Sequence, residues 1–194
     1  MHTKFILIIF ALFAVADMPL FANEHTNIIT ITNVARTHSD TVKAPKSPRM
    51  TANGTIGKTV VTIDYGSPRV RGRVIWGGLV AYGAVWATGA HHATSVTFSR
   101  DVVINGKTVK AGEYALFTIP DKNEWTIILN KNFDQHLADD YDEKQDVARV
   151  KATPKPLEKV QEEMMFSISE KNANEGIISF AWEKITWSLV FKTL

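Results

Sequence analysis

The sequence predicts an all-β fold: an antiparallel β-sandwich, or a flattened barrel, with one short crossover helix, preceded by a signal peptide. Three observations predict it. From Thr55 onward, short β-branched and aromatic runs alternate apolar and polar residues with a period of two. Gly, Asn, Asp and Pro separate these runs at intervals of about 8 to 12 residues, the spacing typical of a sandwich or barrel. An apolar leader stands at the N-terminus.

The alternation indicates which residues share a face of each strand. Side chains two residues apart point to the same side of a strand, so one apolar face of each run is expected to be buried. Leu116, Ile128 and Val190 interrupt the polar face, which indicates strands covered on both sides. The expected apolar faces are Ala115, Phe117 and Ile119; Trp125, Ile127 and Leu129; Met164, Phe166 and Ile168; Ile178, Phe180 and Trp182; and Trp187, Leu189 and Phe191.

The connections between these runs favour antiparallel pairing. Asn105-Gly106 is the dipeptide that best supplies positive φ at both central positions of a two-residue hairpin, so residues 101–104 should pair with residues 107–110. Residues 120–123 turn one run back into the next, and residues 171–176 do the same near the C-terminus. These connections predict a meander.

One segment has helical spacing. In residues 132–144 (NFDQHLADDYDEK), Phe133, His136, Leu137 and Tyr141 recur near a period of 3.6. We therefore expect a single crossover helix there, held to the sheet by Leu137 and Tyr141.

The first residues have the pattern of a secretory signal peptide. Lys4 supplies a positive charge, Phe5–Val15 is an uninterrupted apolar run, and small residues follow, which predicts cleavage after Ala16 or Ala22. The run is shorter than the roughly 20 residues of a membrane-spanning helix, so no membrane anchor is expected after processing. We predict a signal peptide over 1–22, a polar leader or linker over 23–50, a single domain over 51–194, and a location in the periplasm or outside the cell.

Composition excludes several classes of function. A formal net charge of +2 is too small to favour nucleic-acid binding. The absence of cysteine excludes disulfides, thiolate metal ligands and a cysteine nucleophile. The chain has no Gly-x-Ser-x-Gly, phosphate-binding P-loop or His-Glu-x-x-His motif, and no cofactor is expected.

The segment from Tyr65 to His92 has an unusual composition, because it holds three Arg, two Trp, two Tyr and six Gly without clear alternation. On one hypothesis it lines a groove in which guanidinium groups meet a carboxylate or phosphate while aromatic rings stack on a cyclic group. On the other, Trp76 and Trp86 close the end of the sandwich, and the arginines are solvated or paired with Asp64 and Asp101. The candidate ligand-binding residues are Arg69, Arg71, Arg73, Trp76, Tyr82, Trp86, His91 and His92.

The adjacent pair His91-His92 raises the question of a metal. Neighbouring residues of a regular strand point to opposite faces, so the two imidazoles could share one ion only on irregular backbone. A zinc site needs further ligands, for which His136, Asp64 and Asp134 are the chemical candidates. The competing interpretation is one buried and one exposed histidine.

Several strings of the sequence together have the specificity of a family signature. They are DYGSPRVRGRVIWGGLV (64–80), YGAVW (82–86), TGA (88–90), AGEYALFTIP (111–120) and EWTIILN (124–130). They resemble the uncharacterised bacterial family known as domain of unknown function 2911, over roughly residues 47–194. The resemblance implies an exported β-sandwich-like domain and supplies no activity. The chain departs from the family pattern at Ala81, Ala87 and His91, where Pro, Arg and Asn are usual.

These observations favour binding over catalysis. We expect an exported, soluble binding or accessory module that recognises a small anionic or cyclic molecule, a glycan or a peptide. The alternatives are a metal-assisted enzyme that uses His91 or His92, and a structural protein of the cell envelope.

Overall fold

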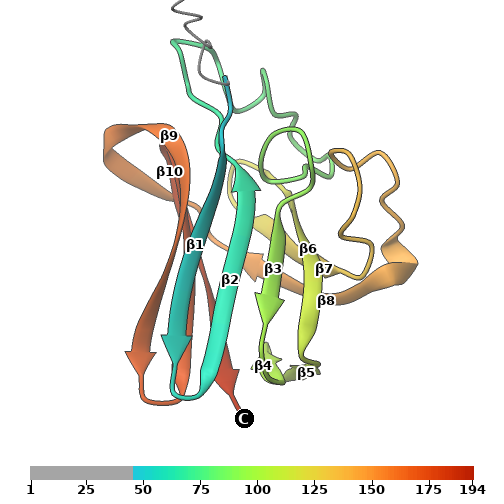
Figure 1. Ribbon diagram of the computed structural model, residues 1–194. Helices are drawn as coiled ribbons and strands as arrows, with labels where there is room; N and C mark the ends of the chain where they lie inside the picture. The colour runs from blue at the N-terminus through green and yellow to red at the C-terminus, as the bar shows by residue number, and fades with distance from the viewer. Residues whose placement is uncertain (1–45) are drawn as a thin grey trace, which may run out of the picture. The chain divides into compact units, whose positions relative to one another are not determined.

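A computed structural model describes residues 46–194, which form two antiparallel β-sheets (Figure 1). The expected signal peptide and most of the expected linker lie outside these residues. Within residues 46–194, no helix has the length and apolar character needed to cross a membrane. The strands are β1 (Arg49–Ile56), β2 (Thr59–Gly66), β3 (Ser95–Phe98), β4 (Val102–Ile104), β5 (Lys107–Val109), β6 (Gly112–Ile119), β7 (Trp125–Asn130), β8 (Asp146–Ala152), β9 (Lys155–Asn172) and β10 (Glu175–Thr193).

The two sheets pack face to face, as the layers of a β-sandwich do. The larger sheet has the order β1-β2-β3-β6-β7-β8 and the smaller has the order β5-β4-β10-β9. The rings of Tyr65 on β2 and Phe166 on β9 lie 5.1 Å apart across the gap, and those of Phe98 on β3 and Phe191 on β10 lie 5.7 Å apart. One main core, formed by side chains from both sheets, fills the space between the layers. The predicted all-β, antiparallel architecture is confirmed.

The predicted buried faces are confirmed for all five runs, with Ile119 and Ile168 only partly buried. The inward residues of β7, β9 and β10 belong to the main core or pack against it. On β6 the predicted face is buried in a second cluster, in which Ala115 and Phe117 meet Ile128 on the outer side of the larger sheet, while Leu116 on the opposite face points into the main core. Loop residues cover this second cluster, so β6 and β7 are buried on both sides, as Leu116 and Ile128 indicated. Val190 is 38% exposed and does not follow that expectation.

The predicted hairpin at Asn105-Gly106 is confirmed. Asn105 has a φ of 49° and Gly106 a φ of 77°, the left-handed values that a tight two-residue turn requires. The last two strands extend farther toward their turn than expected, because only Ala173 and Asn174 connect β9 to β10. The two runs expected on either side of Glu183 lie on the single strand β10, and a register shift at Glu183, whose φ is 53°, bends that strand.

The first strand begins earlier than the domain boundary expected from the sequence. β1 starts at Arg49, within the segment interpreted as a linker. It is an edge strand whose outward positions are polar and exposed, so its composition resembles that of a loop. Its inward side is nevertheless packed, because a Cβ added to Gly54 would lie 2.4 Å from the Cγ2 atom of Ile168.

The helix predicted over residues 132–144 does not form. Residues 131–142 form an irregular loop along the outer face of β6 and β7, and only Glu143–Gln145 make a turn of 3₁₀ helix. Side chains satisfy the backbone instead: Asn132 N–H donates to Asn130 Oδ1, and Asp140 N–H donates to Gln135 Oε1. Such local bonds compete with a helix, and Leu137 has a left-handed φ of 49°. Leu137 and Tyr141 do hold this segment to the sheet, as expected, since both pack against the second cluster.

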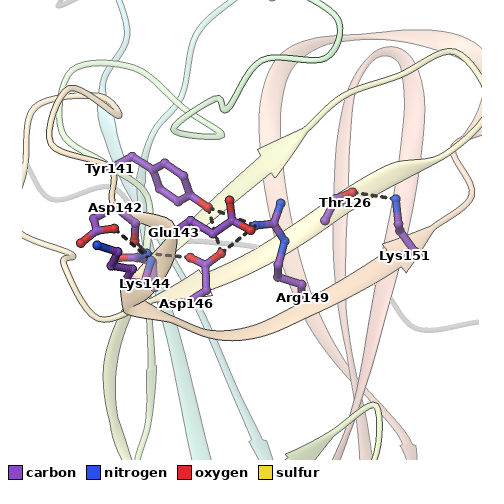
Figure 2. A network of polar contacts seen from close by, with 9 residues as sticks. Thr126, Tyr141, Asp142, Glu143, Lys144, Asp146, Arg149 and Lys151 are labelled. Atoms are coloured by element: carbon purple, nitrogen blue, oxygen red, sulfur yellow. Dashed lines mark hydrogen bonds and ion pairs between the residues drawn. The ribbon is translucent and has the colours of Figure 1, made fainter.

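A polar network around Asp146 fixes the end of this loop (Figure 2). The carboxylate of Asp146 accepts hydrogen bonds from the Tyr141 hydroxyl at 2.8 Å and from the Asn130 amide at 2.7 Å, and it pairs with Arg149 at 3.1 Å. The Asp146 side chain is 7% exposed. Burying a charge is tolerated when it is paired and hydrogen-bonded, as this carboxylate is.

This network predicts a loss of stability in alkali. Burial, together with the hydrogen bond to Asp146, raises the pKa of Tyr141 above its ordinary value. The folded protein therefore holds the phenolic proton more tightly than the unfolded chain, and this stabilisation is complete below the unfolded pKa of about 10 and is lost as the pH rises through and above it. We expect the free energy of unfolding of Tyr141→Phe to fall less steeply than that of the wild type in alkali. Urea unfolding at a series of pH values measures the two slopes.

The control for this prediction is Tyr82→Phe, which changes an exposed tyrosine whose hydroxyl, unlike that of Tyr141, has no carboxylate partner within residues 46–194. Its slope should equal that of the wild type. Identical slopes for Tyr141→Phe and the wild type would contradict the role assigned to the Tyr141 hydroxyl.

The two-layer core predicts a contrast between two phenylalanines. Phe180 is fully buried between the sheets, so Phe180→Ala should lower the free energy of unfolding by about 3 to 5 kcal/mol. Phe133 is 38% exposed on the loop, and Phe133→Ala should cost about 1 kcal/mol or less. Urea titration of both variants measures the difference, and equal destabilisation would refute the assignment of Phe180 to the core.

Candidate functional site

The connection between β2 and β3, residues 67–94, is a long irregular segment that we call the end loop (Figure 1). Backbone hydrogen bonds tie it to both sheets. Val70 N–H donates to the Glu162 carbonyl and Met164 N–H donates to the Pro68 carbonyl, both at 2.9 Å, which adds a short piece of ladder to β9. Farther along, Trp86 exchanges two hydrogen bonds with Thr118 on β6. The end loop is therefore held in place against both sheets.

Two glycines allow the end loop to fold back on β2. A Cβ added to Gly66 would lie 2.2 Å from the carbonyl oxygen of Ala90, and one added to Gly89 would lie 2.7 Å from the Thr94 hydroxyl. No side chain fits at either place. These glycines permit the close approach of two backbone segments.

All five tryptophans of the chain join one aromatic cluster. Trp76 packs edge to face on Trp125 at 4.9 Å and on Trp182 at 5.7 Å, while Trp86 stacks on Trp182 at 5.8 Å with 22° between the ring planes. Trp187 completes the set through Trp125 at 6.5 Å. Trp76 and Trp86 are half-buried and thus close the end of the core, as the second hypothesis for this segment expected.

The three arginines of the loop lie at its surface and bind protein groups. Arg69 pairs with Glu163 of β9 at 3.3 Å. Arg71 donates from its guanidinium to the Lys46 carbonyl at 2.9 Å. Arg73 donates from Nε to the Val70 carbonyl at 3.1 Å and from Nη2 to the Arg69 carbonyl at 2.5 Å. The carboxylates considered as their partners are engaged elsewhere, because Asp64 pairs with Arg49 and Asp101 pairs with Lys110.

A cavity of about 300 Å³ opens between the end loop, β10 and the 131–142 loop. We call it the loop cavity. Three of the candidate residues line it together: Arg73, Trp86 and His91. The other five, Arg69, Arg71, Trp76, Tyr82 and His92, do not line it. The remaining wall residues are Ser47, Pro68, Leu79, Val80, Gly89, Ala90, Leu137 and Trp182.

The two histidines occupy different environments. His91 lines the loop cavity and has a φ of 68°, a left-handed conformation that few residues other than Gly, Asn, Asp and His adopt readily. His92 lines a separate hollow of about 220 Å³ with Arg49 and Asp134. Both histidines are exposed, which differs from the expectation of one buried and one exposed side chain. Within residues 46–194, no three His, Cys, Asp or Glu side chains gather where they could hold a metal ion.

Sequence reasoning missed the walls that other segments contribute. Trp182 is fully buried in the core, as expected, but it also supports the cavity wall from behind through its stacking on Trp86. Leu137 was expected to hold a helix to the sheet, and it reaches the cavity because the loop that replaces the helix passes close to His91, whose carbonyl accepts from Leu137 N–H at 2.7 Å. No local pattern in the sequence pairs these distant segments.

The arrangement can bind a small molecule. Its wall combines the half-buried indole of Trp86 and aliphatic side chains with one guanidinium and one imidazole, which is the usual composition of a ligand site: mostly apolar, with few polar groups.

Comparison with known proteins gives one result. No curated protein and no solved structure matches the chain. A family model described as "Protein of unknown function (DUF2911)" matches residues 47–191, most of the described chain. The earlier resemblance is thus confirmed, and the chain belongs to the DUF2911 family.

Proposed function

We propose that this protein is an exported binding module whose loop cavity takes a small ligand that carries a ring and an anionic group. The observation that carries the proposal is the convergence of Arg73, His91 and Trp86 on one cavity, with the fully buried Trp182 stacked behind Trp86. These residues come from two segments about a hundred positions apart in the sequence.

The charge of the cavity supports an anionic ligand. Arg73 and His91 line it, and no Asp or Glu of residues 46–194 does. Arg73 offers five N–H donors in a planar fork. Two of its nitrogens donate to the loop carbonyls of Val70 and Arg69, which hold the guanidinium in place. The donors that are left can meet a carboxylate or phosphate without first being ordered, and this lowers the entropy lost on binding.

The aromatic wall supports a cyclic ligand. Trp86 is half-buried and rests on Trp182, so its ring cannot move freely. Rigid aromatic faces provide a large contact area at low conformational cost. Leu79, 51% exposed, and Val80 extend the apolar wall.

The histidines offer a matched pair of variants for a binding test. His91→Asn keeps a residue that tolerates the left-handed φ of 68° and removes the imidazole from the cavity. We expect this variant to bind more weakly by about three- to tenfold, the effect of losing one hydrogen bond. Isothermal titration with benzoate, glucuronate and N-acetylmuramate, each a ring with a carboxylate, measures the change.

His92→Asn and Arg71→Ala are the controls, because both side chains lie outside the loop cavity. Both should bind like the wild type. A second variant, Ala90→Phe, fills the cavity. If His91→Asn and Ala90→Phe, tested separately, both bind with wild-type affinity, the proposed site is wrong.

Export is the second part of the proposal, and it rests on the apolar leader of residues 5–15. When the full chain is expressed in a bacterium, we expect the mature protein in the periplasm or the medium, shortened at Ala16 or Ala22. Intact-mass spectrometry of each cell fraction identifies the product. A full-length chain that stays in the cytoplasm would refute export without bearing on the cavity.

A further inference from the structure

A second hollow, of about 360 Å³, lies among β5, the start of β6 and the segment that joins β7 to β8. Four lysines from separate segments line it, and we call it the lysine hollow. Its lining is Lys107, Thr108, Val109, Lys110, Tyr114, Lys131, Lys144, Gln145, Asp146 and Val147. None of these residues lines the loop cavity.

The positive charges of this hollow are only partly neutralised. Lys110 pairs with Asp101 at 2.9 Å. Lys107, Lys131 and Lys144 form no ion pair with any carboxylate among residues 46–194. Like charges brought together repel one another, so an arrangement of this kind is favourable when an anion joins it.

The acidic groups around the hollow are already engaged. Asp146 accepts from Asn130, Tyr141 and Arg149, which occupies both of its oxygens. Beside Lys144, the Asp142 carboxylate accepts from the Lys144 backbone N–H, and the Glu143 carboxylate pairs with Arg149 at 2.6 Å.

The backbone adds a donor on the same side. β5 is the outer strand of the smaller sheet, so one of its edges has no neighbouring strand. Across the two-residue turn, Ile104 and Lys107 are a hydrogen-bonded pair, and pairs alternate along an antiparallel ladder, so Val103 and Thr108 are not hydrogen-bonded. From this register we infer that the Thr108 N–H points away from β4, toward the open edge of β5.

We propose that the lysine hollow binds a phosphoryl group. Its lining supplies several ammonium donors, the Thr108 hydroxyl and an edge N–H, while its single carboxylate already accepts three contacts from protein groups. A phosphate group carries a charge of about −1.5 to −2 and three strong acceptor oxygens, which matches a lining rich in donors and poor in free acceptors. The volume also accommodates the group to which the phosphate is attached, either a soluble sugar or glycerol phosphate or the headgroup of an anionic lipid.

The test compares two triple variants of equal charge. Lys107→Gln/Lys131→Gln/Lys144→Gln removes the unpaired lysines of the hollow. Lys58→Gln/Lys122→Gln/Lys184→Gln removes three exposed lysines that line neither this hollow nor the loop cavity and form no ion pair within the described chain. Each protein is titrated with glycerol 3-phosphate at low ionic strength by calorimetry, and its co-sedimentation with phosphatidylglycerol and phosphatidylcholine vesicles is measured.

We expect the wild type and the control variant to bind glycerol 3-phosphate with affinities that agree within about twofold, and the hollow variant to lose about tenfold or more. Additional binding to phosphatidylglycerol vesicles, lost in the hollow variant, would identify the source as a lipid headgroup; its absence would identify a soluble phosphate ester. Equal weakening in both variants, or no binding of either probe by the wild type, would overturn the proposal. Circular dichroism and the melting temperature confirm that each variant is folded.

Discussion

The stacking of Trp86 on Trp182 is the contact on which the arrangement of this domain depends. Trp86 belongs to the end loop and Trp182 to β10, so the contact at 5.8 Å joins a connection of the larger sheet to the smaller sheet. Trp86 also lines the loop cavity, and the fully buried Trp182 supports it from behind. The same contact thus closes the core and holds the binding wall, and the stability of the fold and the shape of the cavity cannot be varied independently.

The aromatic cluster also carries polar groups that the core does not satisfy. The indole N–H groups of Trp125, Trp182 and Trp187 are buried without an acceptor among residues 46–194, whereas Trp76 donates to Glu183 at 3.2 Å. An unsatisfied buried donor costs about 1 to 3 kcal/mol. Ring faces offset part of this cost, because edge-to-face packing places the positive edge of one ring against the negative face of another. Apolar burial therefore stabilises the cluster despite its unmet hydrogen bonds.

Local patterns predicted what depends on local physics. The alternation of Trp125, Ile127 and Leu129 and the Asn105-Gly106 turn are properties of single strands and single hairpins, and the structure confirms both. The helix failed because side-chain bonds such as that of Asn132 compete with helical ones, which residue spacing does not report. The loop cavity could be predicted only in part: Arg73, Trp86 and His91 share one loop, but Trp182 and Leu137 reach them through contacts between distant segments. The departure from the family pattern at His91 has a backbone explanation, since Asn and His both tolerate its left-handed φ.

The short ladder between the end loop and β9 affects how copies of this protein meet one another. β9 is the outer strand of its sheet, and a bare strand edge recruits other chains into continuous sheets. Here residues 68–70 cover the edge around Glu162, and Pro156, which has no N–H to offer, interrupts its outer part with Lys155 and Lys159 on either side. A second copy of the chain therefore finds the middle of this edge already paired and its outer part without a regular row of donors.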